Sequence, residues 1–149
     1  MMLDIERSAR AVELLRRALP AWLDGRCPAR PQSADGITLT RPLHREDGRL
    51  DPGVPAALLE RRVRALAPWP GTFVEAAEGR LAILRAAVAD ELPGDVPGVV
   101  VADDGGLALT TASGRLRLLQ VRPAGGRSMS GIDLRNGRPG WVGARLVHA

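Results

Sequence analysis

The first 33 residues show the polar and apolar spacing of a helix and then lose any period. Within residues 4–23, apolar side chains recur every three or four positions, as on one face of an amphipathic helix. That stripe consists of Val12, Leu15, Leu19, Trp22 and Leu23. Gly25 is a suitable helix end, and the proline-containing residues 27–33 are typical of an extended linker. We therefore predict that residues 1–33 form a helix and linker separate from the rest.

The next apolar positions predict one short strand and a second helix. Residues 37–40 (Ile-Thr-Leu-Thr) favour a strand, and residues 44–49 form a charged turn. In residues 55–66 the leucines and valine return at helical spacing, and Pro55 suits a first helical turn. The segment Pro-Trp-Pro-Gly at residues 68–71 ends this helix.

Beyond residue 71 the pattern changes to short strand-like runs separated by glycine-containing turns. The predicted strands are residues 72–75, 80–88, 98–102, 107–111 and 115–122. In the last strand the alternation slips at Leu119, which indicates a bulge, and Ser130 is placed to cap a short helix over residues 130–136. Closely spaced short strands favour a small barrel. We expect an α+β fold, mainly β, with an OB-like barrel at residues 34–149.

Composition adds a charge asymmetry to this picture. All 21 basic residues are arginine, and 17 acidic residues leave a net charge of +4. Residues 101–149 hold most of the excess, with seven arginines against three acidic residues. Exclusive use of arginine is typical of a GC-rich genome, but arginine also recognises anions through its planar guanidinium. Both interpretations stay open.

The residues that could support other chemistry are few. A lone cysteine, Cys27, excludes an internal disulfide, and with two histidines no usual zinc set can be assembled, so we expect no metal and no cofactor. No stretch has the apolar length of a membrane span, and the N-terminus is charged where a signal peptide is apolar. We expect a cytoplasmic protein without membrane association.

One stretch resembles a known family. Residues 59–73, Leu-Glu-Arg-Arg-Val-Arg-Ala-Leu-Ala-Pro-Trp-Pro-Gly-Thr-Phe, closely resemble the helix and PWPG segment that open the C-terminal domain of methionyl-tRNA formyltransferases. Residues 46–51, Glu-Asp-Gly-Arg-Leu-Asp, are similar to that family's DGRID segment, and residues 114–125 to its penultimate strand and turn. The order and spacing of these segments agree from about residue 35 to residue 146.

The resemblance implies a non-catalytic module. The family's formyl transfer takes place in an N-terminal Rossmann-type domain that binds 10-formyltetrahydrofolate and uses an Asn, a His and an Asp. This sequence has no Asn-x-His segment, and its single asparagine is Asn136, so we expect no catalytic residue. Residues 1–33 resemble only the end of that domain. Two positions depart from the family: Ala67 replaces an Asn, and Pro52 stands where an aromatic residue is common.

The PWPG segment and the arginines are the candidate functional residues. Pro68 and Pro70 restrict the backbone around Trp69, and Gly71 permits a tight exit, so we predict that Trp69 plugs the barrel as a structural anchor. The resemblance implies that a basic face of the domain contacts the tRNA acceptor arm. The candidates for such phosphate contacts, or for a merely solvated face, are Arg115, Arg117, Arg122, Arg127, Arg135 and Arg138. Arg115 and Arg117 alternate with leucines and should project from one outer face.

Three hypotheses follow. The chain is a tRNA- or nucleic-acid-binding module, alone or with a separately encoded formyltransferase half. Alternatively, it is a small enzyme of a specialised biosynthetic pathway that reuses the barrel, which predicts a concave apolar pocket for a small molecule. Thirdly, it is a dimeric scaffold. The apolar stripe of residues 4–23 needs a cover, and we favour self-association or a partner protein.

Overall fold

The computed structural model describes the backbone of residues 2–31 and 33–147, and the side chains of these residues from residue 8 onward. The chain consists of two units. The first unit is Met1–Arg41 and the second is Pro42–Ala149. The first contains helix α1 (Met2–Leu23), which agrees with the predicted helix. Backbone amides of Arg26 and Cys27 donate to the Ala21 carbonyl and end the helix beside Gly25, whose φ is +70°.

The stripe on α1 is exposed. Its five members are between 41% and 69% exposed: Val12, Leu15, Leu19, Trp22 and Leu23. The described residues 24–31 and 33–44 contain no strand, so the strand expected at residues 37–40 is wrong. Leu39 is 92% exposed there, and none of the described strands pairs with this segment.

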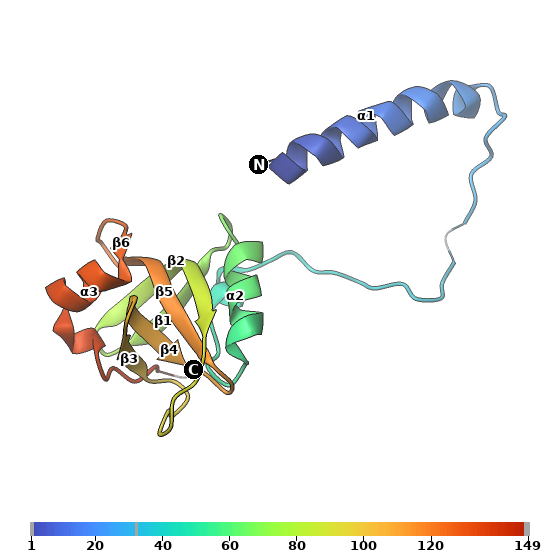
Figure 1. Cartoon of the computed structure of the whole chain (residues 1–149). Coiled ribbons are helices and arrows are strands. Elements are labelled where there is room, and N and C mark those ends of the chain that lie inside the picture. The colour runs from blue at the N-terminus through green and yellow to red at the C-terminus, as the bar shows by residue number, and fades with distance from the viewer. Residues whose placement is uncertain (1, 32, 148–149) are drawn as a thin grey trace. The chain divides into compact units, whose positions relative to one another are not determined.

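The second unit is built on a six-stranded sheet (Figure 1). Its strands are β1 (Thr72–Ala76), β2 (Gly79–Ala89), β3 (Val100–Asp103), β4 (Gly106–Thr110), β5 (Arg115–Pro123) and β6 (Met129–Ser130). They pair in the order β1-β2-β5-β4-β3, with β6 also on β5, and every pair is antiparallel. The predicted strands are therefore confirmed, and the fold is α+β.

The long pair β2–β5 carries two offsetting irregularities. Ile83 pairs with Val121 and Arg85 with Gln120, so Leu84 is an extra residue in β2. Ala86 then pairs with Leu118, so Leu119 is an extra residue in β5. The bulge predicted at Leu119 is thus present, and the bulge in β2 restores the register.

The sheet is not a closed barrel, because no ladder joins its edge strands β1 and β3. The C-terminal segment lies at both edges instead. The Leu146 amide donates to the Gly98 carbonyl just before β3, and the Val147 amide donates to Glu75 in β1. Isolated bridges pair Ala76 with Leu146 and residue 99 with residue 145. The α+β fold class is therefore confirmed, whereas the OB-like barrel is not confirmed, because the sheet is open and its two edges share this segment.

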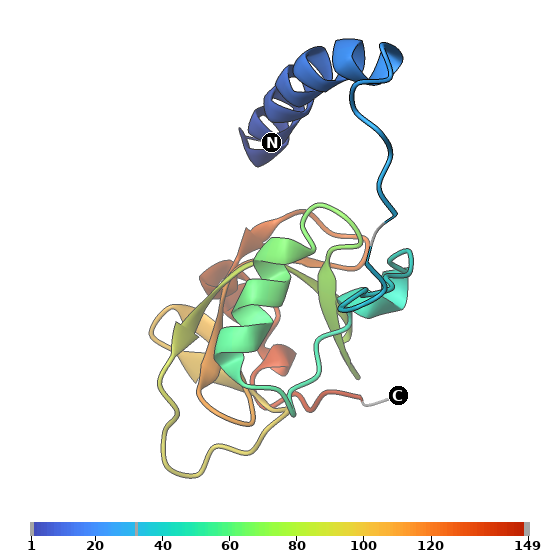
Figure 2. The same cartoon turned by 90° about the vertical axis from the view of Figure 1, so that its right-hand side faces the viewer.

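Helices cover the sheet and complete its core. Helix α2 (Ala56–Ala65) packs on β2 and β5 (Figure 2), and α3 (Gly131–Gly137) packs on β4 and β5. Ser130 caps α3 by accepting from the Asp133 amide at 3.1 Å, as predicted. Short 3-10 helices occur at η1 (Arg45–Gly48) and η2 (Pro139–Trp141). None of the described helices is long and apolar enough to cross a bilayer.

Candidate nucleic-acid interface

The first predicted arginine, Arg115, is engaged inside the fold. Its side chain, 9% exposed, donates through both Nε and Nη2 to the carboxylate of Asp95, and the Nε–Oδ2 distance is 2.6 Å. Asp95 lies in the β2–β3 connection, where its Oδ2 also accepts from the Leu92 amide. The hydrogen bond from Arg115 lowers the pKa of Asp95 and outweighs the opposing effect of desolvation. Arg115 therefore does not project into solvent.

Arg117 and Arg135 also hold the domain together. Arg117 Nε forms an ion pair with the carboxylate of Asp103, at the end of β3, and lowers the pKa of that carboxyl. Arg135 on α3 donates to the carbonyl oxygens of Asp103 and Gly106, which flank the β3–β4 turn. Both side chains fix this turn against neighbouring elements, so three of the six candidate arginines have a structural task.

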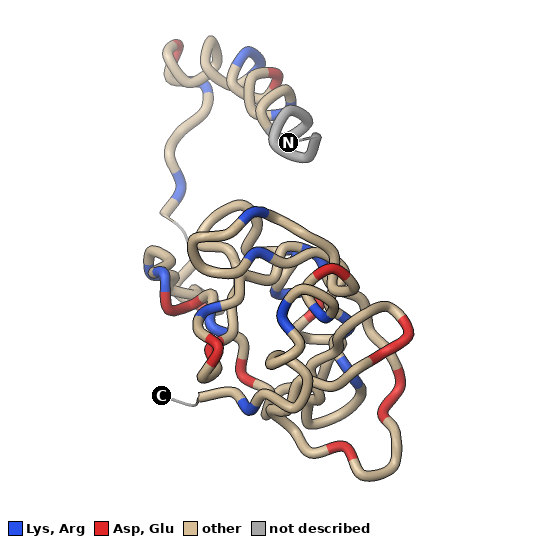
Figure 3. The backbone as a smooth tube through the Cα atoms, turned by 90° about the vertical axis from the view of Figure 1, so that its left-hand side faces the viewer, with Lys and Arg blue, Asp and Glu red and all other residues tan. Residues whose placement is uncertain are grey.

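The other three candidates have free charges. Arg122, Arg127 and Arg138 are exposed and have no acidic partner within the described residues. Arg127 and Arg138 line one groove together with Met129 and Asp133, whereas Arg122 lies on a different part of the surface. Figure 3 shows that basic and acidic positions are interspersed over the tube rather than separated into two faces. The arginines without an acidic partner therefore form separate small patches and not one continuous basic face.

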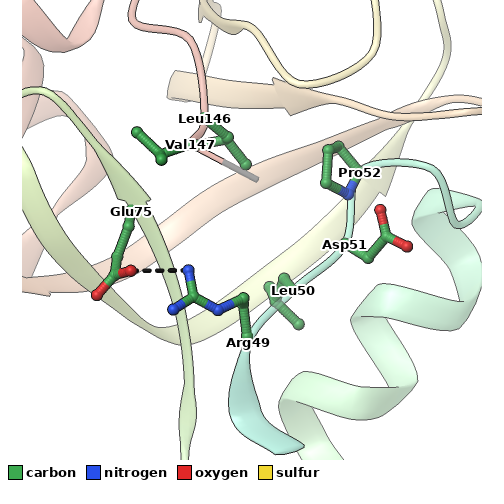
Figure 4. Close-up of a pocket in the computed structure, with 7 residues that line it drawn as sticks. All are labelled: Arg49, Leu50, Asp51, Pro52, Glu75, Leu146 and Val147. Atoms are coloured by element: carbon green, nitrogen blue, oxygen red, sulfur yellow. Dashed lines mark ion pairs between the residues drawn. The ribbon is translucent and has the colours of Figure 1, made fainter. Parts of the chain in front are cut away.

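A cavity of about 230 Å³ lies where the C-terminal segment meets β1. Figure 4 shows Leu146 and Val147 above the ion pair between Arg49 and Glu75, whose closest N–O distance is 2.7 Å. Asp51 points away from this pair, and its carboxylate accepts from the Gly53 amide at 2.8 Å. The charged groups in this cavity are thus bound to near neighbours, and the C-terminal segment is attached here by the backbone hydrogen bond from Val147 to the Glu75 carbonyl.

Trp69 does not plug the sheet, and that prediction is wrong. Its side chain is 56% exposed, whereas the buried tryptophan is Trp141, which is 1% exposed. The PWPG turn holds Trp69 outside because the chain reverses there: the Gly71 amide donates to the Leu66 carbonyl at 2.9 Å, and Gly71 has φ +75°. The adjoining peptide bonds to Pro68 and Pro70 are both cis. The turn is well defined, but it presents the ring to solvent.

The 3-10 helix η1 packs directly against this turn. A Cβ at Gly48 would lie 2.0 Å from the Gly71 carbonyl oxygen, so only glycine permits the approach. Arg62 of α2 donates to the Asp47 carbonyl at 2.8 Å and ties η1 to that helix. This packing places the Arg45 guanidinium over the Trp69 ring, 5.7 Å from its centroid.

The sheet surface next to the PWPG turn also carries basic and aromatic side chains. Phe73 pairs with Ala82 and Ala82 with Arg122, so these three side chains lie on one face of β1, β2 and β5. Arg80 lies over the Phe73 ring at 4.1 Å from its centroid and binds Glu75 at 2.7 Å. Sequence reasoning missed Arg45 and Arg80. A signal was available in the two prolines beside Trp69, since such a turn rarely lies in a sheet core.

Together these features define a class of protein: a small α+β domain whose candidate functional groups are surface arginines and one exposed tryptophan. Residues 42–139 match the family described as formyl transferase, C-terminal domain. The chain therefore belongs to this family, and the resemblance inferred from residues 59–73 is confirmed.

Individual relatives show how much of the family's architecture is covered. The methionyl-tRNA formyltransferase of Halorhodospira halophila is 41% identical over 89% of this chain and 44% of its own length. That of Herpetosiphon aurantiacus is 37% identical over 84% of this chain and 41% of its own length. A crystal structure of HypX from Aquifex aeolicus has a TM-score of 0.57 at 19% identity, covering 85% of this chain and 23% of that chain, and supports the fold. The chain thus spans less than half of these curated relatives.

Proposed function

We propose that this formyltransferase C-terminal-type domain binds tRNA through phosphate contacts made by Arg122, Arg127 and Arg138. The observation that carries the proposal is that these arginines are exposed and free of acidic partners among the described residues. The names of the relatives supply the class of ligand, because they are methionyl-tRNA formyltransferases. Arginine is suited to phosphate binding, since its planar guanidinium forms bidentate hydrogen bonds with a phosphate group. Bound in this way, tRNA could be presented to a separately encoded formyltransferase half.

Salt dependence of tRNA affinity tests this proposal. Each phosphate contact releases counterions, so replacing all three arginines with alanine should lower the slope of log affinity against log salt by about 2 to 3. Arg61 on α2 is also exposed, and Arg61→Ala is the matched control that should leave the slope nearly unchanged. Absence of tRNA binding by the full chain at low salt, or an equal loss in the control, would refute the proposal.

A second property is favoured by the exposed stripe of α1. Val12, Leu15, Leu19 and Trp22 follow one another at spacings of three, four and three, as in the seam of a coiled coil. We propose that two copies of the chain associate along this stripe. Sedimentation equilibrium should detect a dimer that Leu15→Ser weakens, whereas Leu14→Ser, equally exposed but off the stripe, should not. A monomer at all protein concentrations would exclude this association.

A further inference from the structure

We infer that the surface around Trp69 is a stacking site for an unpaired nucleobase, and that Arg45 and Arg122 bind the phosphates of the nucleotides there. The inference rests on the proposed tRNA binding and deepens it, because phosphate contacts alone do not distinguish paired from unpaired nucleotides. This surface is formed by Arg45, Trp69, Arg80, Ala82 and Arg122.

The first support is the presentation of the ring. Trp69 is 56% exposed although it sits in a turn fixed by two prolines and by the hydrogen bond from Gly71 to Leu66. An indole held on a rigid turn loses little conformational entropy when it binds a planar group. Every base offers a π-face, and stacking on an aromatic side chain is a common mode of binding single-stranded nucleic acid.

The second support is the charge around the ring. Arg45 and Arg122 are exposed and have no acidic partner in the described part of the chain, whereas the charge of Arg80 is balanced by Glu75. Arg45 already lies over the indole, with its guanidinium 5.7 Å from the ring centroid, so a flat group can pack against this ring. A nucleotide matches this arrangement because it joins a planar base to an anionic phosphate.

The third support is the shape of the surface. A depression of about 350 Å³ runs from the PWPG turn to β5, and no Asp or Glu lines it. Its floor contains Ala82, whose small side chain lies between Phe73 and Arg122 in neighbouring strands. The depression therefore leads from the exposed ring to a free guanidinium. An acidic peptide could use the two arginines, but it would not need the indole.

The test measures binding of a short single-stranded oligoadenylate RNA to the full chain at low salt. Trp69→Ala should weaken this binding about 10-fold, and Trp69→Phe should restore most of it, because stacking survives with the smaller ring. Leu58→Ala is the matched control, since Leu58 is a large apolar side chain that is 47% exposed on α2 and does not line this depression. The RNA should also quench tryptophan emission of the parent chain and quench that of Trp69→Phe much less.

Two further probes separate the possible outcomes. A blunt RNA duplex should bind Trp69→Ala and the parent chain within about 2-fold, because its bases are not available for stacking. If duplex and single strand both bind and Trp69→Ala behaves like Leu58→Ala, the stacking site is refuted while tRNA binding stands. If neither RNA binds, the proposed function fails and the inference with it. If polyglutamate binds with the same dependence on Trp69, the surface recognises an acidic protein and the inference is overturned.

Discussion

Replacing Asp95 with asparagine removes one charge from the most enclosed ion pair described in the sheet unit. Asp95 is 14% exposed at its side chain, and its partner Arg115 is 9% exposed. Asparagine keeps the size of the side chain and one acceptor oxygen, but it turns an amide donor toward the guanidinium. The variant therefore leaves the Arg115 charge largely desolvated and without a counter-ion.

The size of the effect follows from this geometry. Breaking a buried ion pair by removing one partner costs about 3 to 5 kcal/mol. The residual exposure of both side chains places Asp95→Asn at the lower end, about 3 kcal/mol. With a urea dependence of about 1 to 3 kcal/mol per molar, the unfolding midpoint should fall by about 1 to 3 M.

Urea unfolding followed by far-UV circular dichroism measures this shift. A double variant, Asp95→Leu with Arg115→Met, should recover most of the lost stability, because an apolar pair of similar volume has no charge to desolvate. Glu60→Gln, which removes an ion pair with the 69% exposed Arg64 on α2, should leave the midpoint unchanged. An unchanged midpoint in Asp95→Asn, or a double variant as unstable as the single one, would refute the reasoning.

Three other predictions concern the same unit. Arginine partners lower the pKa values of Asp95 and Asp103. The two ion pairs therefore stabilise the fold fully above about pH 4, and this stabilisation is lost as the pH falls through the folded-state pKa values. When the urea midpoint is measured against pH, it should fall less steeply at acidic pH in Asp95→Asn than in the parent chain. Gly48→Ala should cost about 1 to 3 kcal/mol in urea unfolding, because its Cβ would meet the Gly71 carbonyl oxygen at 2.0 Å, and parent-like stability would contradict that packing. Trp141→Ala should cost about 3 to 5 kcal/mol, because it leaves a cavity in the core. Trp141→Phe should cost clearly less, because it keeps a ring and removes a buried Nε1 that has no hydrogen-bond partner among the described residues. Equal losses in calorimetry would contradict this.

Local patterns in the sequence predicted the elements of the sheet well. Glycine-containing turns separate the strands, and Ser130 caps α3 by accepting a hydrogen bond from the Asp133 amide three residues later. Each of these signals lies within a few residues of the structure that it specifies. The strand expected at residues 37–40 failed because a strand also needs a neighbour, which its own sequence cannot reveal. The OB-like barrel is not confirmed for a related reason, since the edges of the sheet meet only through the C-terminal segment, whose docking no local pattern reveals.

The candidate site was harder to predict because arginines in one strand have partners far along the chain. Arg115 pairs with an aspartate 20 positions earlier and Arg117 with one 14 positions earlier. Alternation with leucines placed both on one face of β5, but it did not reveal that Asp95 in the β2–β3 connection and Asp103 at the end of β3 reach these arginines. Of the six predicted arginines, those without an acidic partner among the described residues are Arg122, Arg127 and Arg138.

The two tryptophans of the sheet unit differ in burial, and the one that the sequence predicted as an anchor is the exposed one. Trp69 has prolines on both sides and looks like a rigid core anchor, yet a turn that is fixed by prolines lacks the backbone donors needed to enter a sheet. Trp141 lies in a short 3-10 helix near the end of the chain, and it is the residue that fills the core. The exposed indole of Trp69 lies beside Arg45 and Arg122, which have no acidic partner among the described residues, and the proposed stacking site gives this exposed ring a role.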